Sequence, residues 1–201
     1  MRPLRAIDGT SLVLPGWVSA HSHAFQYGLR GHTQRAPGET GTFWSWREAM
    51  FSLADSLTPE SLAAVSRDAF RALYRSGVRC VGEFHYVHHQ RGGGAYAQRT
   101  LLSDVVIEAA LAEGLRVTLL RVAYARSAHG RPPEGAQRRF CDGDVDDVLR
   151  DLDALRSRWD ADARVRVGVA PHSVRAVPRE WLGPLNEYAT RYSLPFHMHV
   201  A

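Results

Sequence analysis

The order of short apolar runs and helical segments predicts an α/β fold with parallel strands, of the (β/α)8 barrel type. Runs rich in β-branched residues alternate five times with longer segments of helical periodicity, which is typical of βαβ units. Polar and ionisable residues follow four of the five runs, as in barrel enzymes, whose active sites lie at the carboxyl ends of the strands. The first strand-to-helix turn lacks the G-x-G-x-x-G pattern, which argues against a dinucleotide-binding sheet.

Turn and capping signals set the bounds of the predicted elements. Thr58 followed by Pro59 marks a helix start, and Gly77 and Gly114 mark helix ends. The predicted strands cover residues 17–23, 78–84, 115–123, 165–170 and 195–200. The predicted helices cover residues 43–57, 59–76, 100–113, 144–159 and 178–192.

The number of strands is smaller than a barrel requires. A (β/α)8 barrel has eight strands and about 250 residues, whereas this sequence of 201 residues supplies five. We therefore expect residues 15–201 to form the first five βα units of an incomplete barrel, and residues 1–14 to be the remnant of a small N-terminal β domain. Because an unpaired apolar edge strand promotes aggregation, a chain of these residues alone is expected to be insoluble and inactive.

Composition excludes several function classes. All 25 basic residues are Arg, and they are interleaved with 21 acidic residues without a basic run of five, so a nucleic-acid partner is not predicted. No apolar stretch is long enough to span a membrane, and the predicted location is cytoplasmic. Cys80 and Cys141 have neither disulfide-framework nor zinc-finger spacing.

The segment from Leu14 to Gln26 contains the first candidate site. His21 and His23 are two residues apart at the end of the predicted strand, so both side chains point to one face. Two imidazoles in this arrangement can bind one metal ion. Taken alone, the pair is also consistent with polar residues that face water at a strand end.

Histidines at the other strand ends favour the metal site. His172 follows the fourth predicted strand, His197 and His199 lie on the fifth, and residues 83–89 (EFHYVHH) follow the second. Zinc suits imidazole ligands, and a catalytic zinc site keeps one position open for water. Its bound water has a pKa of about 7 and is nucleophilic at neutral pH.

Several longer motifs resemble the formimidoylglutamate deiminases of the amidohydrolase superfamily. They are residues 13–16 (VLPG), 21–26 (HSHAFQ), 43–47 (FWSWR), 83–89 (EFHYVHH), 168–178 (GVAPHSVRAVP) and 197–201 (HMHVA). The resemblance implies that His21, His23 and His199 are zinc ligands and that His197 is a packed neighbour. It places the glutamate of the family's His-x-x-Glu segment, the general-base histidine and the aspartate ligand beyond Ala201, so no catalytic base is assigned within this sequence.

The resemblance also implies a substrate pocket. It contains Gln26, Arg47, Tyr86, His172 and Arg175, and the expected ligand is a small dicarboxylate, N-formimidoyl-L-glutamate. Two arginines suit two carboxylates. Considered alone, Arg47 also fits a surface helix and Arg175 an ion pair near a helix start. His85, His88 and His89 are expected to be loop residues that orient their neighbours.

The resemblance implies one zinc ion and a hydrolytic deimination of the substrate to N-formyl-L-glutamate and ammonia, a step of histidine degradation. The sequence contains no Lys, the residue that bridges two metals in binuclear members, which favours a mononuclear site. Two alternatives stay open: another deaminase of the superfamily, of the guanine type, and an inactive module that binds metal or carboxylates. A homodimer is a further possibility.

Overall fold

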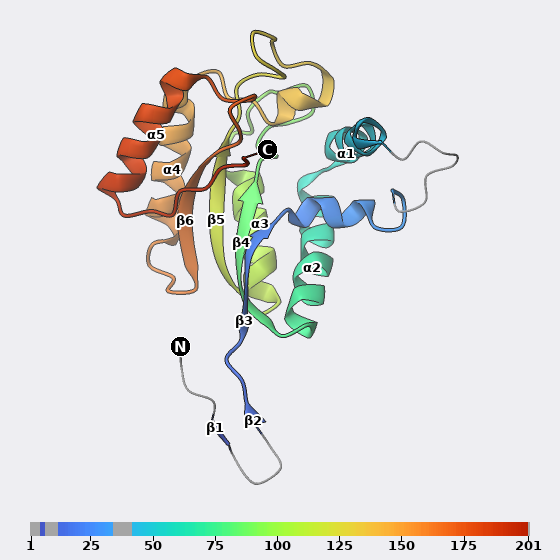
Figure 1. Cartoon of the computed structure of the whole chain (residues 1–201), viewed down its shortest axis with the longest axis vertical. Helices are drawn as coiled ribbons and strands as arrows, with labels where there is room; N and C mark the ends of the chain where they lie inside the picture. The colour runs from blue at the N-terminus through green and yellow to red at the C-terminus, as the bar shows by residue number, and fades with distance from the viewer. Residues whose placement is uncertain (1–4, 7–11, 34–41, 201) are drawn as a thin grey trace.

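The computed structural model describes residues 5–6, 12–33 and 42–200. Its main feature is a parallel sheet of β3 (Trp17–Ser22), β4 (Val78–His85), β5 (Arg116–Ala123) and β6 (Val165–Pro171). The strands are paired in the order β3-β4-β5-β6 (Figure 1). Sequential parallel neighbours require a crossover between each pair, so the predicted alternation of strands and helices is confirmed.

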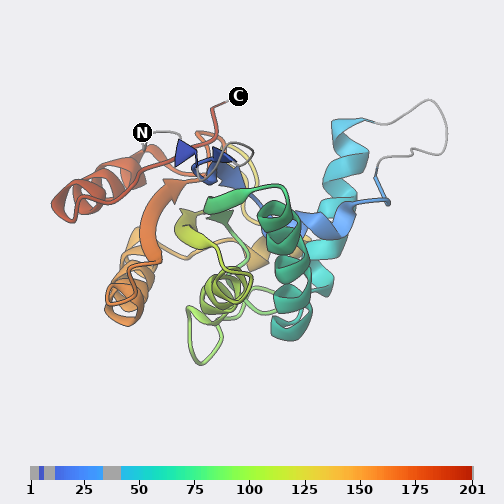
Figure 2. The same cartoon turned by 90° about the horizontal axis from the view of Figure 1, so that it is seen from below.

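The crossover helices lie on one side of this sheet. They are α2 (Pro59–Arg75), α3 (Leu101–Ala112) and α4 (Val145–Trp159), and α5 (Arg179–Arg191) follows β6. Seen from below, the strands form an arc with α2, α3 and α4 on its outer side (Figure 2). The arc leaves the carboxyl ends of the strands together, which is where the sequence places its histidines.

Two further elements stand between β3 and α2. A 3-10 helix, η1 (Ala24–Leu29), begins after His23 and was not predicted. Helix α1 (Phe43–Ser56) agrees with the prediction. In the long loop after β5, a second 3-10 helix, η2 (Gly135–Arg139), was not predicted.

The predicted start of α2 is confirmed by its capping contacts. The Thr58 hydroxyl accepts the Ser61 N–H at 3.2 Å, the Ser61 hydroxyl accepts the Thr58 N–H at 2.8 Å, and Pro59 occupies the first turn. Such reciprocal caps satisfy two N–H groups that the helix itself leaves unpaired.

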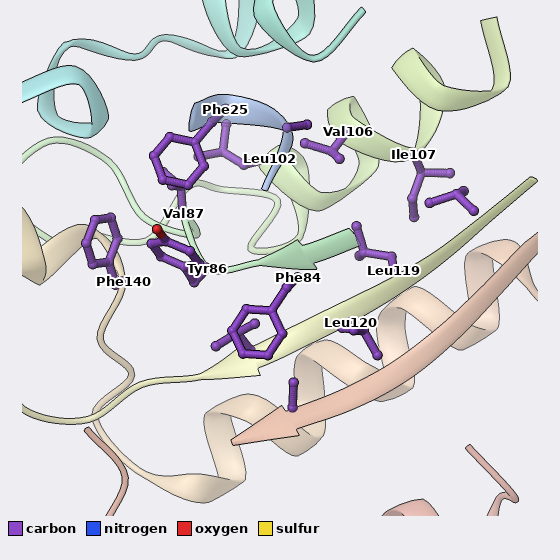
Figure 3. Close-up of a cluster of buried hydrophobic side chains, with 14 of the residues drawn as sticks. Phe25, Phe84, Tyr86, Val87, Leu102, Val106, Ile107, Leu119, Leu120 and Phe140 are labelled. Carbon is purple, nitrogen blue, oxygen red and sulfur yellow. The ribbon is translucent and has the colours of Figure 1, made fainter. Parts of the chain in front are cut away.

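The core lies on both faces of β4 and β5, whose carboxyl-terminal parts, residues 83–85 and 119–123, are buried. Leu119 points toward Ile107 of α3, whereas Phe84 and Leu120 point away from that helix (Figure 3). Strands buried on both faces read as continuous apolar runs. Close strand approach also depends on Gly82, where a Cβ atom would lie 2.6 Å from the Ala20 carbonyl oxygen.

The predicted fifth strand is wrong as a regular element. Residues 195–200 are extended and follow β6, with the Val169 N–H donating to the Pro195 carbonyl at 2.9 Å and the His197 N–H to the Val169 carbonyl at 3.0 Å. Only Val169 and Phe196 form a parallel bridge. In the described part of the chain no strand pairs with the other edge of this segment, so it lacks the second ladder that an interior barrel strand has.

The N-terminal strands β1 (Arg5–Ala6) and β2 (Leu12–Val13) pair antiparallel. Their assignment to a separate β domain stays a prediction. None of the helices in the described ranges has the length and apolar character needed to cross a membrane.

Candidate metal centre and adjoining cavity

Three of the predicted ligands converge on one point. The Nε2 atoms of His21 and His23 lie 3.0 Å apart, and the His199 Nε2 lies 3.2 Å from that of His21. All three potential ligand atoms lie within 4.8 Å of one another. The period-two geometry of β3 therefore brings His21 and His23 to one face as predicted, and the segment beside β6 adds His199 across the sheet end.

Backbone contacts fix the orientation of two of these rings. His23 Nδ1 lies 2.9 Å from the Phe84 carbonyl oxygen, which makes Nδ1 the donor and leaves the Nε2 lone pair free. The His199 ring stacks on the Phe84 ring, with 4.2 Å between centroids, and the backbone N–H of His199 donates to the His172 carbonyl at 3.0 Å. Both ligand atoms are thus aimed before any ion binds.

The protonation state of the three rings also suits a metal. Burial lowers the pKa of His23 to about 4. Burial also lowers the pKa of His21 and His199 below their usual value, and a smaller contribution comes from a nearby histidine, His197 for His21 and His21 for His199. Neutral imidazole is the form that binds metal. Three convergent nitrogen donors fit zinc, which takes three protein ligands and an open position in many catalytic sites.

The catalytic groups expected beyond Ala201 lie outside the described residues. The described part of the chain ends at Val200, so Ala201 itself is also outside it. The general-base histidine, the aspartate ligand and the glutamate of the His-x-x-Glu segment therefore stay predictions. No catalytic base is assigned to a described residue.

The remaining histidines of the matched motifs have other environments. His197 lies outside the group of three, and its role as a packed neighbour stays a prediction. The expectation that His85, His88 and His89 are loop residues is wrong in part, because His85 belongs to β4 and all three are buried. His88 Nε2 contacts the Val122 carbonyl at 2.9 Å, and His89 Nε2 lies 3.5 Å from Asp142.

A cavity of about 530 Å³ adjoins the three histidines. It contains every residue that the resemblance placed in a substrate pocket, together with two of the three metal-ligand candidates. The lining residues are His23, Gln26, Phe43, Trp46, Arg47, Met50, Phe51, Tyr86, Tyr124, Phe140, His172, Ser173, Val174, Arg175 and His199. The structure thus brings the predicted residues together; the roles assigned to them stay predictions.

Polar groups near the metal centre are held by one another. The Gln26 side-chain amide donates to the Tyr86 hydroxyl at 2.6 Å, and that hydroxyl also contacts the Met50 sulfur at 3.8 Å. Burial raises the pKa of Tyr86 above its usual value, so its hydroxyl keeps its proton. Burial lowers the pKa of His172 to about 3, which leaves a neutral imidazole in the cavity.

The two arginines enter the cavity from different elements. Arg47 extends from α1 with its guanidinium over the Phe51 ring, 4.8 Å from the centroid. Arg175 follows β6 and donates from Nη1 to the Ser127 carbonyl at 2.8 Å. Neither arginine is ion-paired with a carboxylate of the described residues. Both positive charges are therefore available to an anionic ligand.

Sequence reasoning missed several residues of the site. The Phe84 ring supports His199, and the buried Glu83 carboxylate accepts the Ala24 N–H at 2.7 Å, which fixes the turn after His23. Burial raises the pKa of Glu83 to about 7. Both residues lie inside the EFHYVHH motif, residues 83–89, and membership of that motif was the signal available in the sequence. Phe140 had no such signal, because it enters the cavity from a loop without periodicity.

The sequence is similar to those of known amidohydrolases and deaminases. The model of the amidohydrolase family matches residues 12–201. The formimidoylglutamate deiminase of Pseudomonas aeruginosa is 35% identical over 206 aligned residues, which cover 100% of this chain and 45% of that protein. A 5-methylthioadenosine/S-adenosylhomocysteine deaminase of Desulfovibrio desulfuricans is 26% identical, over 96% of this chain and 37% of that protein.

Solved structures agree on the fold. An amidohydrolase from Brucella melitensis superposes with a TM-score of 0.85 at 37% identity, covering 92% of this chain and 41% of that one. A zinc complex of atrazine chlorohydrolase from Arthrobacter aurescens gives a TM-score of 0.75 at 20% identity, over 94% of this chain and 41% of that one. The chain spans less than half the length of these relatives, and the predicted barrel-type fold is confirmed. By the family match over residues 12–201, the chain belongs to the amidohydrolase family.

Proposed function

We propose that the protein containing this chain is a zinc-dependent hydrolase that converts N-formimidoyl-L-glutamate to N-formyl-L-glutamate and ammonia. The observation that carries the proposal is a single cavity that joins converging histidines to two arginines without ion pairs. The overall reaction adds water to the formimidoyl carbon, breaks the bond to the terminal nitrogen and releases that nitrogen as ammonia. The similarity to the Pseudomonas aeruginosa deiminase supports this substrate.

One zinc ion would be held by His21, His23 and His199. When bound there, it supplies Lewis acidity and lowers the pKa of water. The absence of Lys from the sequence supports a mononuclear site.

The chain's own residues bind and orient the substrate in this proposal. Arg47 and Arg175 hold the two carboxylates, because guanidinium groups bind carboxylates through paired hydrogen bonds. The Gln26–Tyr86 pair and the neutral His172 line the same cavity and would be the hydrogen-bond partners of the formimidoyl group. Apolar rings around the cavity exclude water and strengthen these contacts.

The direct test is ammonia release from N-formimidoyl-L-glutamate by the complete, zinc-loaded protein. We expect turnover of this substrate, and 5-methylthioadenosine and guanine serve as comparison substrates. Turnover of either heterocycle without turnover of the dicarboxylate would contradict the proposal.

A deaminase of neutral heterocycles is the second candidate. It is favoured by the aromatic residues of the cavity, Phe43, Trp46, Tyr124 and Phe140, whose rings could stack on a purine, and by the relatives named for such substrates. Two unpaired arginines favour the dicarboxylate instead. An inactive binding module would bind zinc but release ammonia from none of the three substrates.

A further inference from the structure

The loops after β5 and β6 are joined by two arginines, each of which donates to backbone carbonyls of the other loop. Arg126, in the β5 loop, donates to carbonyls of the β6 loop, and Arg175, in the β6 loop, donates to the carbonyl of Ser127. We infer that Arg126 is a positioning residue that sets Arg175 for carboxylate binding; this inference rests on the proposed function.

The Arg126 side chain meets the β6 loop at three points. Its Nε donates to the Arg175 carbonyl at 3.0 Å, and its Nη2 lies 3.2 Å from the carbonyls of both Val174 and Val177. A planar guanidinium presents its donors in a fixed fork. Its orientation relative to these carbonyls is therefore set by several contacts at once.

The backbone beside Arg126 continues the same contact. The N–H groups of Ala125 and Arg126 donate to the Ala176 carbonyl at 3.0 and 3.1 Å. Together with the side chain, they bind the carbonyls of residues 174–177. The Cα of Arg175 is thus held from both sides by one short segment of the β5 loop.

Arg175 in turn donates to the β5 loop and still has N–H donors left for a ligand. One nitrogen, Nη1, donates to the Ser127 carbonyl at 2.8 Å, while the side chain still lines the cavity with His172. A guanidinium has five N–H donors, so the bond to Ser127 orients the group without exhausting it. Loss of the Arg126 guanidinium would remove its bond to the Arg175 carbonyl. The Arg175 guanidinium would then be held less firmly in its orientation toward the cavity.

The charge of Arg126 has no carboxylate partner among the described side chains. Arg126 could therefore aid a bound anion in two ways, by holding Arg175 or by its positive charge alone. The variant Arg126→Lys separates them, because it keeps the charge but loses the planar fork.

The test is a double-mutant cycle in the complete protein, with Arg126→Met, Arg175→Met and both together. We expect Arg126→Met to lower kcat/KM by about tenfold, mainly through KM, because misplacement of a binding group weakens substrate positioning. The loss should vanish in the Arg175→Met background and persist in Arg126→Lys. Additive losses, or full activity of Arg126→Lys, would overturn the inference. Arg179→Met, an exposed change at the start of α5, is the matched control.

Amide hydrogen exchange gives a readout that needs no substrate. The N–H groups of Ala176 and Val177 donate to the Ser173 carbonyl at 3.1 and 3.0 Å, and we expect both to exchange faster in Arg126→Met. Unchanged exchange in a folded variant would overturn the inference. A wild-type protein that does not turn over N-formimidoyl-L-glutamate would contradict the proposed function, whereas the exchange result would still decide whether Arg126 holds the loop.

Discussion

The two ends of the cavity are built differently. At the metal end, His21 lies on β3, His23 directly follows it, and His199 lies on an extended segment that is hydrogen-bonded to β6. At the arginine end, Arg47 projects from α1 and Arg175 from a loop. Metal ligands need fixed positions within a few tenths of an ångström, and the parallel sheet supplies them. The arginine end depends on side chains that bind backbone carbonyls.

Arg139 shows how such a side chain holds α1. Its buried guanidinium donates from Nη1 to the carbonyls of Ala54 and Leu57, at the end of the helix, and from Nε to the carbonyl of His89 after β4. Burial lowers the pKa of Arg139 below its usual value. A cation at a helix C-terminus interacts favourably with the helix dipole. The position of Arg47 thus depends on a residue far away in the sequence.

The largest expected effect concerns the metal end. His199→Ala should weaken zinc binding by more than about 100-fold, because even loss of an outer hydrogen-bond partner of a ligand costs about 10- to 100-fold. Zinc affinity is measured by competition with a chromophoric chelator. His197→Ala, two residues earlier on the same segment, should keep wild-type affinity; equal losses in the two variants would remove His199 from the ligand set.

Loss of the Arg139 contacts that hold α1 should lower the stability of the fold. Arg139→Met leaves the carbonyls of Ala54, Leu57 and His89 without their donor, and a buried unpaired polar group costs about 1–3 kcal/mol. We expect the free energy of unfolding in urea to fall by about 3 kcal/mol. Arg138→Met, the exposed neighbour, should change it by less than about 0.5 kcal/mol. A loss in Arg139→Met no larger than in this control would show that the clamp does not stabilise α1.

Substrate binding should change without a comparable change in fold. Arg47→Met should lower kcat/KM by about 30-fold, equivalent to about 2 kcal/mol, because charge-assisted hydrogen bonds contribute about that much. Zinc affinity should stay unchanged, which separates the two ends of the cavity. Arg67→Met, an exposed change on α2, is the matched control, and a similar loss in that variant would contradict the assignment of Arg47.

A smaller effect is expected on acid stability. Burial alone would raise the pKa of the Asp142 carboxyl, but Arg121, at 2.6 Å, and His89 outweigh burial and hold that pKa below its ordinary value of 3.8. Because the folded pKa is lowered, this contribution to stability is present above pH 3.8 and is lost as the pH falls through the folded pKa.

Asp142→Asn should therefore flatten the acid limb of the stability curve, measured by urea unfolding between pH 5 and pH 2. Asp146→Asn, exposed in the first turn of α4, should leave that limb unchanged. If stability fell with pH in Asp142→Asn as steeply as in the wild type, the buried ion pair would not drive acid unfolding.

The metal end could be predicted from the sequence more directly than the arginine end. Period-two alternation places His21 and His23 on one face, whereas His199 was indicated as the third ligand by its place in the family's His-x-x-Glu segment. Arg47 and Arg175 have no such rule, because a helix and an irregular loop set their positions, and only the family motifs indicated a shared pocket.

The misses have physical causes as well. Residues 195–200 have the composition of a strand, but only Val169 and Phe196 form a bridge with β6, and no described strand pairs with the other edge of this segment. His85, His88 and His89 read as polar loop residues because the sequence does not show that the chain folds back over them. The backbone N–H groups of His88 and His89 both donate to the Arg139 carbonyl, a contact across about 50 residues that no local pattern reveals.

The most direct test of the account compares two substrates that differ by one carboxylate. N-formimidoyl-L-glutamate and N-formimidoyl-4-aminobutanoate carry the same formimidoyl group, and kcat/KM is measured for both with the complete protein and with Arg47→Met and Arg175→Met. We predict that loss of the carboxylate costs at least about 30-fold in the wild type, and that one of the two arginine variants no longer distinguishes the substrates. Equal kcat/KM values in the wild type would contradict the claim that this cavity pairs a metal centre with arginines that bind a dicarboxylate.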